Sequence, residues 1–369
     1  MKTVIVIGGG LSGLISAIQL AKAGIHVLLF ERKNYPFHRV CGEFISNETI
    51  PFLKANGIFP EEFNPPHIHR LQLTSVNGKW AELPLKLGGW GISRYTFDHF
   101  LYIRAREAGV VFHLNTEVLD VSFAGNQFTV HTSSQSFTAE VVIGTFGKRS
   151  KLDMQMKRAF IQKRSPYVGV KYHIRYDHPE DCIALHNFQD GYCGISNIEN
   201  GKTNLCYLTL RDHLRRFGSI RLMEERVLFE NPFLKKIFQH AEFLFDKPEV
   251  INEISFEKKS PVEDHILMAG DSAGMITPLC GNGMAMAIHS AKLLSDHIIS
   301  FCKDELTRDL LEKNYAQKWN ATFAQRLWAG KKIQHLFGSE WTSDLAVNIA
   351  RHARPIAQFL INQTHGKPF

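Results

Sequence analysis

The stretch that most constrains the fold of this chain is residues 3–31, TVIVIGGGLSGLISAIQLAKAGIHVLLFE. Residues 3–7 are β-branched or apolar and predict a buried β-strand. Apolar and polar residues then follow with helical spacing up to Gly24, which predicts an amphipathic helix that ends at this glycine. A second apolar run, residues 26–30, predicts another strand. The order strand, helix, strand predicts a parallel βαβ unit and therefore an α/β fold.

Three glycines and one acid give this unit the features of a nucleotide site. Gly8 permits the tight turn out of the strand, Gly10 lets the backbone approach a pyrophosphate, and Gly13 lets helix and sheet pack closely. The helix N-terminus directs free N–H groups toward phosphates. Glu31 follows the glycines by about 20 residues, where a carboxylate accepts hydrogen bonds from an adenosine ribose. The candidate binding residues of this unit are Gly8, Gly10, Leu11, Ser12, Gly13, Glu31 and Arg32.

A secretory signal is the competing interpretation of the N-terminus, because Lys2 precedes an apolar run. Glycines and serines interrupt this run, and it continues into the strand that ends at Glu31, so we favour the nucleotide-binding unit. No other stretch combines the length and apolarity that a membrane span needs. We therefore expect a soluble, cytoplasmic protein.

Charge and residue usage argue against several classes of partner. The net charge of +7 suits an anionic cofactor, an acidic substrate or a membrane surface. The basic residues are spread along the chain without an arginine-rich arm, so we expect no nucleic-acid partner. The six cysteines form no CxxC pair and are expected to be reduced thiols. His67 and His69 have no third ligand nearby in the sequence, and we predict no metal site.

A second segment with glycines, residues 266–291, reads ILMAGDSAGMITPLCGNGMAMAIHSA. A short buried strand meets a Gly-Asp pair, a loop with one proline follows, and a Gly-x-Gly sequence opens a long apolar helix. This order resembles the second fingerprint of FAD enzymes with the glutathione-reductase-type Rossmann fold. The resemblance implies that Asp271 binds the ribityl chain and that the helix N-terminus lies at the isoalloxazine ring, where its dipole stabilises a reduced flavin. It adds these expected FAD contacts: Gly270, Asp271, Pro278, Gly281, Asn282, Gly283 and Met284.

Two segments between the fingerprints resemble the same group of enzymes. Residues 92–112 resemble its Arg-containing helix and the strand after it, which implies that Arg94 lies near the pyrophosphate or ribityl chain of FAD; Val118 is a further expected contact. Residues 141–150 resemble a segment whose Asp is associated with nicotinamide use in aromatic hydroxylases. Phe146 replaces that Asp here. Direct reduction by the hydroxylase route is therefore in doubt, and NADPH, NADH and a partner reductase all stay open as electron donors.

The loop at residues 38–48, HRVCGEFISNE, resembles the Cys-Gly loop of geranylgeranyl-reductase-like flavoproteins. In that group the Cys lies beside the flavin, which makes Cys41 the candidate catalytic residue. The alternative is that Cys41 serves only as a small residue in a tight loop whose backbone binds FAD. Arg39 and Gly42 are expected FAD contacts by the same placement. Glu43 is either a proton donor near the flavin or a solvated loop charge, and we favour the solvated charge.

A later segment, residues 190–206, resembles the strand pair that covers the flavin in this group. Geranylgeranyl reductases carry Tyr-x-Trp-x-Phe-Pro there, and this chain keeps only the tyrosine, Tyr192, which we expect in the substrate pocket. The Trp-x-Trp-x-Ile-Pro motif of tryptophan halogenases is absent from the sequence. The resemblance therefore supports a flavin enzyme more strongly than it supports an isoprenoid substrate.

The expected architecture is α/β, with a Rossmann-like FAD-binding domain, an inserted antiparallel β-sheet substrate domain and a helical C-terminal region. We expect the FAD domain to be discontinuous (residues 1–65, 94–160 and 250–302), with the substrate domain formed by residues 66–93 and 161–249. Residues 303–369 are expected to form helices that cap the pocket or touch a membrane surface. We favour packing of these helices on the protein over membrane contact.

The leading functional hypothesis is an FAD-dependent oxidoreductase, a reductase or dehydrogenase that acts on an apolar or conjugated small molecule. The flavin would carry two electrons, and the protein would supply position, electrostatics and water exclusion. A flavin-dependent monooxygenase or halogenase-like enzyme is the alternative. A third hypothesis, from another class, is a flavin-binding module without turnover that senses redox state through Cys41.

Overall fold

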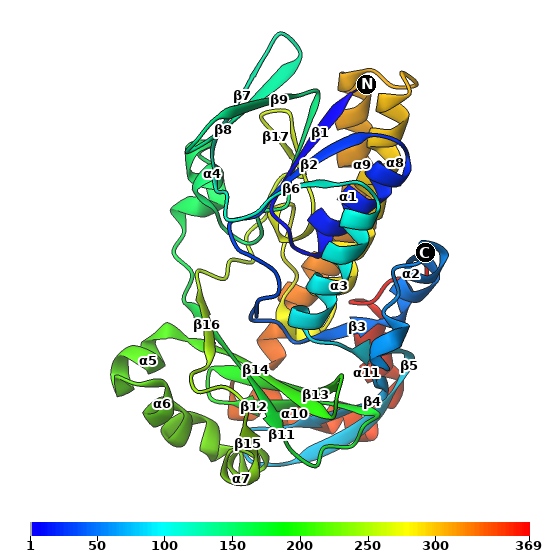
Figure 1. Cartoon of the computed structure of the whole chain (residues 1–369). Coiled ribbons are helices and arrows are strands. Elements are labelled where there is room, and N and C mark those ends of the chain that lie inside the picture. Colours follow the sequence, from blue (N-terminus) through cyan, green and yellow to red (C-terminus); the bar gives the residue numbers. More distant parts are fainter. Residues whose placement is uncertain (1) are drawn as a thin grey trace.

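The computed structural model describes residues 2–369 and contains two large sheets, one above the other in Figure 1. The upper sheet has six strands, and its core is parallel. Its central strands, β1 (Thr3–Ile7) and β10 (Val141–Gly144), are buried on both faces, as expected for a parallel sheet built from runs of Val and Ile. In spatial order they are β17 (Val262–Glu263), β18 (Ile266–Met268), β10 (Val141–Gly144), β1 (Thr3–Ile7), β2 (His26–Phe30) and β6 (Val111–His113).

Helices cover one side of the upper sheet, where Figure 1 shows α1, α3, α8 and α9 grouped together. A small three-stranded sheet and α4 (Lys151–Gln155) lie on the opposite side. The predicted βαβ unit is confirmed, because β1 and β2 pair in parallel and α1 connects them. The helices are α1 (Leu11–Lys22), α3 (Arg94–Glu107), α8 (Gly283–Cys302) and α9 (Arg308–Ile333), and the small sheet contains β7 (Val118–Ala124), β8 (Gln127–Thr132) and β9 (Ser136–Ala139).

The lower sheet has nine strands and is mostly antiparallel, as the sequence predicts. One pair, β4 with β12, is parallel, which is possible because the chain passes through the upper sheet between these two strands. In spatial order the strands are β15 (Glu242–Phe243), β11 (Tyr167–Arg175), β14 (Lys202–Leu210), β13 (Gly191–Ile198), β12 (Cys182–Phe188), β4 (His67–Thr74), β5 (Trp80–Gly91) and β3 (Phe44–Ser46), with β16 (Glu249–Asn252) beside β11.

Two groups of helices pack on the lower sheet. Met223 and Leu234, from the first group, join a core with strands β11 to β14. Val347 and Ala350, from the C-terminal group, join a core with Leu73 and Leu83 of β4 and β5. The first group is α5 (Arg211–Phe217), α6 (Ile220–Val227) and α7 (Pro232–His240); the second is α10 (Glu340–His352) and α11 (Arg354–Asn362), and the short α2 (Ile50–Ala55) lies near the C-terminus in Figure 1.

The expected fold class is confirmed: a Rossmann-like sheet, a second sheet and C-terminal helices are all present. The exact division into domains stays a prediction. Strand β3 illustrates why, because it lies within the range expected for the FAD domain yet pairs with β5 in the lower sheet. Within residues 2–369, no helix has the length and apolarity required to cross a membrane.

Candidate functional site

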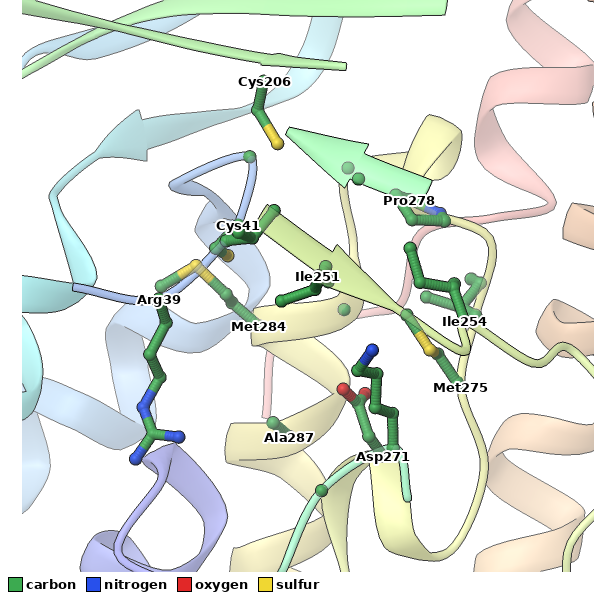
Figure 2. Close-up of a pocket in the computed structure, with 18 of the residues that line it drawn as sticks. Arg39, Cys41, Cys206, Ile251, Ile254, Asp271, Met275, Pro278, Met284 and Ala287 are labelled. Carbon is green, nitrogen blue, oxygen red and sulfur yellow. The ribbon is translucent and has the colours of Figure 1, made fainter. Parts of the chain in front are cut away.

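A cavity of about 930 Å³ lies between the two sheets and contacts most of the residues predicted from the sequence. Figure 2 shows part of its wall, with Arg39 and Cys41 on one side and Asp271 and Pro278 on the other. The predicted residues that line it are Gly8, Gly10, Leu11, Ser12, Glu31, Arg32, Arg39, Cys41, Gly42, Arg94, Val118, Tyr192, Asp271, Pro278, Gly281, Gly283 and Met284. Gly13, Gly270 and Asn282 lie behind this wall.

The glycine turn after β1 leaves an open cradle at one position only. A Cβ atom on Gly8 would lie 2.5 Å from the Thr145 carbonyl oxygen, and one on Gly13 would lie 2.0 Å from the Gly8 carbonyl oxygen. Both glycines are therefore required by packing within the protein. At Gly10 the nearest atom is 3.7 Å away, on Arg94. The space at Gly10 fits a ligand that approaches the backbone, such as a pyrophosphate.

Glu31 lies at the end of β2 with its side chain held in place. Its carboxylate accepts hydrogen bonds from the Gly9 N–H at 2.9 Å and the Lys33 N–H at 3.1 Å. The residue is 5% exposed and lines the cavity. The carboxylate is thus fixed where the sequence predicts a ribose contact.

Two arginines flank the cradle and share one buried acid, Asp98. Arg94 donates to Asp98 at 2.7 and 2.8 Å from Nε and Nη2, and Arg39 Nε donates to it at 3.0 Å. Asp98 is 1% exposed, so this carboxylate braces both guanidinium groups. The pair supplies fixed positive charge beside Gly10, which suits an anionic cofactor.

Asp271 lies in a short 3₁₀ turn (Gly270–Ser272) after β18. Burial raises the pKa of its carboxyl group, and the charges of Lys259 and Arg94 partly offset that rise. Lys259 Nζ also donates to the Asp271 and Lys148 carbonyl oxygens, both at 2.7 Å. Sequence reasoning missed Lys259, which lies on a loop without a motif.

The N-terminus of α8 faces the cavity through Gly283 and Met284. Asn282 precedes the helix but makes no side-chain cap; its Nδ2 donates instead to the Thr364 carbonyl oxygen at 2.6 Å. Gly281 has φ +61°, a conformation that favours glycine. The first turn of α8 therefore offers uncapped N–H groups to a ligand, as the FAD resemblance implies.

Cys41 lines the cavity, and burial raises the pKa of its thiol above the ordinary value. Asn204 Nδ2 donates to the Cys41 carbonyl oxygen at 3.2 Å and so fixes the loop. Figure 2 shows Cys206 on the facing strand, with its sulfur directed toward this loop. A protonated thiol is a poor nucleophile, which argues against a nucleophilic role for Cys41. Its catalytic role stays a prediction.

The expectation that Glu43 is a solvated loop charge is wrong. Its side chain is 0% exposed and forms ion pairs with Lys171, also 0% exposed, and with His173 at 2.7 Å. Burial by itself would raise the pKa of Glu43, but Lys171 and His173 lower it to about 2. Glu43 also accepts a hydrogen bond from the Arg94 backbone N–H at 2.7 Å. A buried ion cluster therefore stands directly behind the Cys41 loop.

The other end of the cavity is apolar, and sequence reasoning found only Tyr192 of its wall. Tyr192 is 5% exposed and lies in β13. Alternate residues of the lower sheet face the cavity from one side, and α10, α11 and the segment before them close it from the other. The apolar residues are Leu71, Leu73, Leu83, Leu85, Ile183, Leu185, Leu208, Ile333, Leu336, Phe337, Ala346, Ile349, Ala350, Ala357, Leu360 and Ile361.

Comparison with known families supports the nucleotide-binding half of this site. Residues 1–181 match the family described as the FAD binding domain. The open cradle at Gly10, the braced arginines and the uncapped first turn of α8 are the features that such a cofactor needs, so the residues present fit FAD.

The chain also resembles named proteins along nearly its whole length. Digeranylgeranylglycerophospholipid reductase 2 of Methanopyrus kandleri is 24% identical over 359 residues, covering 93% of this chain and 88% of the relative. A geranylgeranyl bacteriochlorophyll reductase-like structure from Thermoplasma acidophilum has a TM-score of 0.79 at 18% identity, covering 100% of this chain and 97% of that one. A flavin-dependent brominase has the same fold, with a TM-score of 0.79 at 17% identity and coverage of 99% and 96%.

Proposed function

Since the chain is an FAD-dependent oxidoreductase of the superfamily that includes geranylgeranyl reductases and aromatic hydroxylases, we propose that it reduces carbon–carbon double bonds in a long isoprenoid chain. The observation that carries this proposal is the length of apolar wall that continues the cavity away from the FAD segments. A flat aromatic substrate needs a compact pocket, whereas this wall runs from the lower sheet to α11. The relatives named as digeranylgeranylglycerophospholipid reductases support the same substrate class.

The protein's own residues supply binding and exclusion of water. FAD, when bound, would supply two electrons as a hydride, and a protein group would supply the proton that completes the reduction of the double bond. The apolar wall gains free energy by removing the isoprenoid chain from water, about 0.8 kcal/mol for each buried methylene. The first turn of α8 stabilises negative charge at its N-terminus. We place the proton source at the Cys41 side of the cavity, because burial keeps the Cys41 thiol protonated there. Glu43 is ionised and paired, so it holds the loop and carries no proton to give.

The donor and the cellular setting are part of the proposal. Phe146 lies in the cavity wall at the place where hydroxylases carry an Asp. We therefore favour a partner reductase over direct reduction by NADPH or NADH, and we place the reaction in the cytoplasm without a nucleic-acid partner. The predicted FAD contacts, Tyr192 as a substrate contact and the domain limits are proposals of the same kind.

The test uses FAD-loaded protein that has been reduced with dithionite under anaerobic conditions. Addition of a geranylgeranyl phospholipid should restore the absorbance of oxidised flavin, and mass spectrometry should find two more hydrogens for each double bond reduced. The fully saturated phospholipid is the matched control and should leave the flavin reduced. Reoxidation that needs oxygen and yields an oxygenated product would support a monooxygenase and overturn the proposal.

A further inference from the structure

The outer side of the C-terminal helices exposes four large apolar side chains. Trp341 and Leu345 of α10 are 74% and 37% exposed, and Ile356 and Phe359 of α11 are 55% and 61% exposed. Their spacings of four and three residues place each pair on one side of its helix. Scattered single apolar residues are ordinary on a protein surface, but here two exposed pairs lie on helices that contact each other. We call these four residues the outer patch.

The inner sides of the same two helices are apolar as well. Ile349 and Ala350 of α10 and Leu360 and Ile361 of α11 line the cavity. Helices at the surface of a globular protein normally turn a polar side outward. Here α10 and α11 carry apolar residues on both sides and stand between the apolar cavity and the outer patch.

Cationic side chains border the outer patch. Arg351 and Arg354 are exposed and stand at the junction of α10 and α11. Residues 331–369 contain five lysine or arginine residues and two acidic ones, Glu340 and Asp344. Asp344 is paired with Lys79 at 2.7 Å and Lys331 with Glu257 at 3.7 Å, both partners lying outside this range, so four cations and one acid remain in the charge balance. An apolar patch with cations beside it is typical of a surface that binds anionic lipid.

We propose that the outer patch docks the protein on an anionic lipid surface, so that α10 and α11 lie between the lipid and the cavity. The inference rests on the proposed function, because an isoprenoid chain attached to a phospholipid resides in such a surface and scarcely dissolves in water. It revises the expectation that these helices serve for packing alone. The aromatic pair Trp341 and Phe359 supplies contact area, and Arg351 and Arg354 supply attraction to phosphate.

The test is sedimentation of the FAD-loaded protein with vesicles. Vesicles containing phosphatidylglycerol should bind the protein, pure phosphatidylcholine vesicles should bind it less, and added salt should weaken binding. The double variant W341S/F359S should bind roughly ten- to a hundredfold more weakly, since two large apolar side chains no longer enter the lipid. Leu222→Ser is the matched control, because Leu222 is 48% exposed on α6, and it should bind like the wild type.

A second measurement separates this inference from the proposed function. Turnover of a substrate dissolved in detergent should be the same in the double variant and the wild type, because neither residue lines the cavity. Wild-type protein that ignores anionic vesicles would overturn the docking inference while leaving the function intact. Light scattering that shows a dimer lost in the double variant would assign the patch to a second copy, and would also overturn it.

Discussion

At the scale of single residues, Glu43 combines two costs that the fold has to offset. It is completely buried, and its φ of +52° is uncommon for a residue with a side chain. Lys171 and His173 offset the burial by pairing with the two carboxylate oxygens. Because both partners lie on β11, the cluster joins the Cys41 loop to the lower sheet. Glu43 thereby helps to hold the cofactor loop against the sheet that carries the substrate wall.

Replacement of Glu43 by glutamine should destabilise the protein by about 3–5 kcal/mol, because Lys171 would stay charged and buried without its partner. The folded-state pKa of Glu43 is lowered to about 2, from an ordinary value of 4.5. The stability that this group contributes is therefore present above pH 4.5 and is lost as pH falls toward 2. Urea unfolding at pH 7 and at pH 3 measures both effects.

Glu61→Gln is the control for that experiment, since Glu61 is 65% exposed and pairs with Lys54 on the surface. It should change the free energy of unfolding by less than about 0.5 kcal/mol. If Glu43→Gln proved as stable as Glu61→Gln at pH 7, the buried cluster would contribute nothing to the fold.

The contrast between Gly10 and Glu43 explains what the sequence can predict at this scale. Gly10 is recognisable because the strand, the turn and the helix that define its role are its immediate neighbours in the chain. Lys171 and His173 stand 128 and 130 positions from Glu43. No local pattern records such a pairing, and a charged residue in a loop is ordinarily solvated. Burial of Glu43 follows only from the way in which the two sheets meet.

At the scale of elements, helix α6 is attached to the lower sheet by a buried acid. Glu224 of α6 accepts hydrogen bonds from the hydroxyl groups of Tyr172 in β11, at 3.0 Å, and Tyr207 in β14, at 2.7 Å. The residue is 6% exposed. Both hydroxyl groups donate to the same oxygen atom, Oε1, and without a cation they compensate a negative charge poorly. Attachment of α6 should therefore depend on whether Glu224 is protonated.

Burial raises the pKa of Glu224 to about 7, although hydrogen bonds from Tyr207 and Tyr172 oppose the rise. A raised folded-state pKa gives a contribution to stability that is complete below pH 4.5 and is lost as pH rises to 7. Glu224→Gln should remove this loss, so that the variant exceeds the wild type by up to about 3 kcal/mol at pH 8. Thermal unfolding at pH 5 and pH 8 measures this difference in stability.

Glu225→Gln, a change at a more exposed neighbour, is the control and should keep the wild-type dependence of stability on pH. If Glu224→Gln also kept that dependence, the argument would be refuted.

At the scale of the whole molecule, the cavity has a half that could be predicted and a half that could not. The FAD side is built from turns and helix ends whose glycines lie close together in sequence, as at Gly8 and Gly281. The apolar side takes alternate residues from strands far apart, such as Leu73 and Leu185, and closes them with Ala350 and Ile361 of the last helices. Taken one at a time in the sequence, each of these residues looks like an ordinary core residue. Only the packing of α10 and α11 on β4 and β5 turns them into one wall.

The extent of the apolar half of the cavity predicts that the protein selects isoprenoid substrates by their chain length. Ala350 is 2% exposed and lines the cavity, so Ala350→Phe should fill part of the apolar half. A geranylgeranyl substrate should then bind about 1–3 kcal/mol more weakly, the cost typical of overpacking, while a geranyl substrate and FAD bind as before. Titration of both substrates and of FAD, followed by flavin absorbance, measures the difference. Asn348→Phe, on the exposed side of the same helix, is the control and should change neither substrate. Equal losses for the long and the short chain would mean that the isoprenoid does not extend along α10.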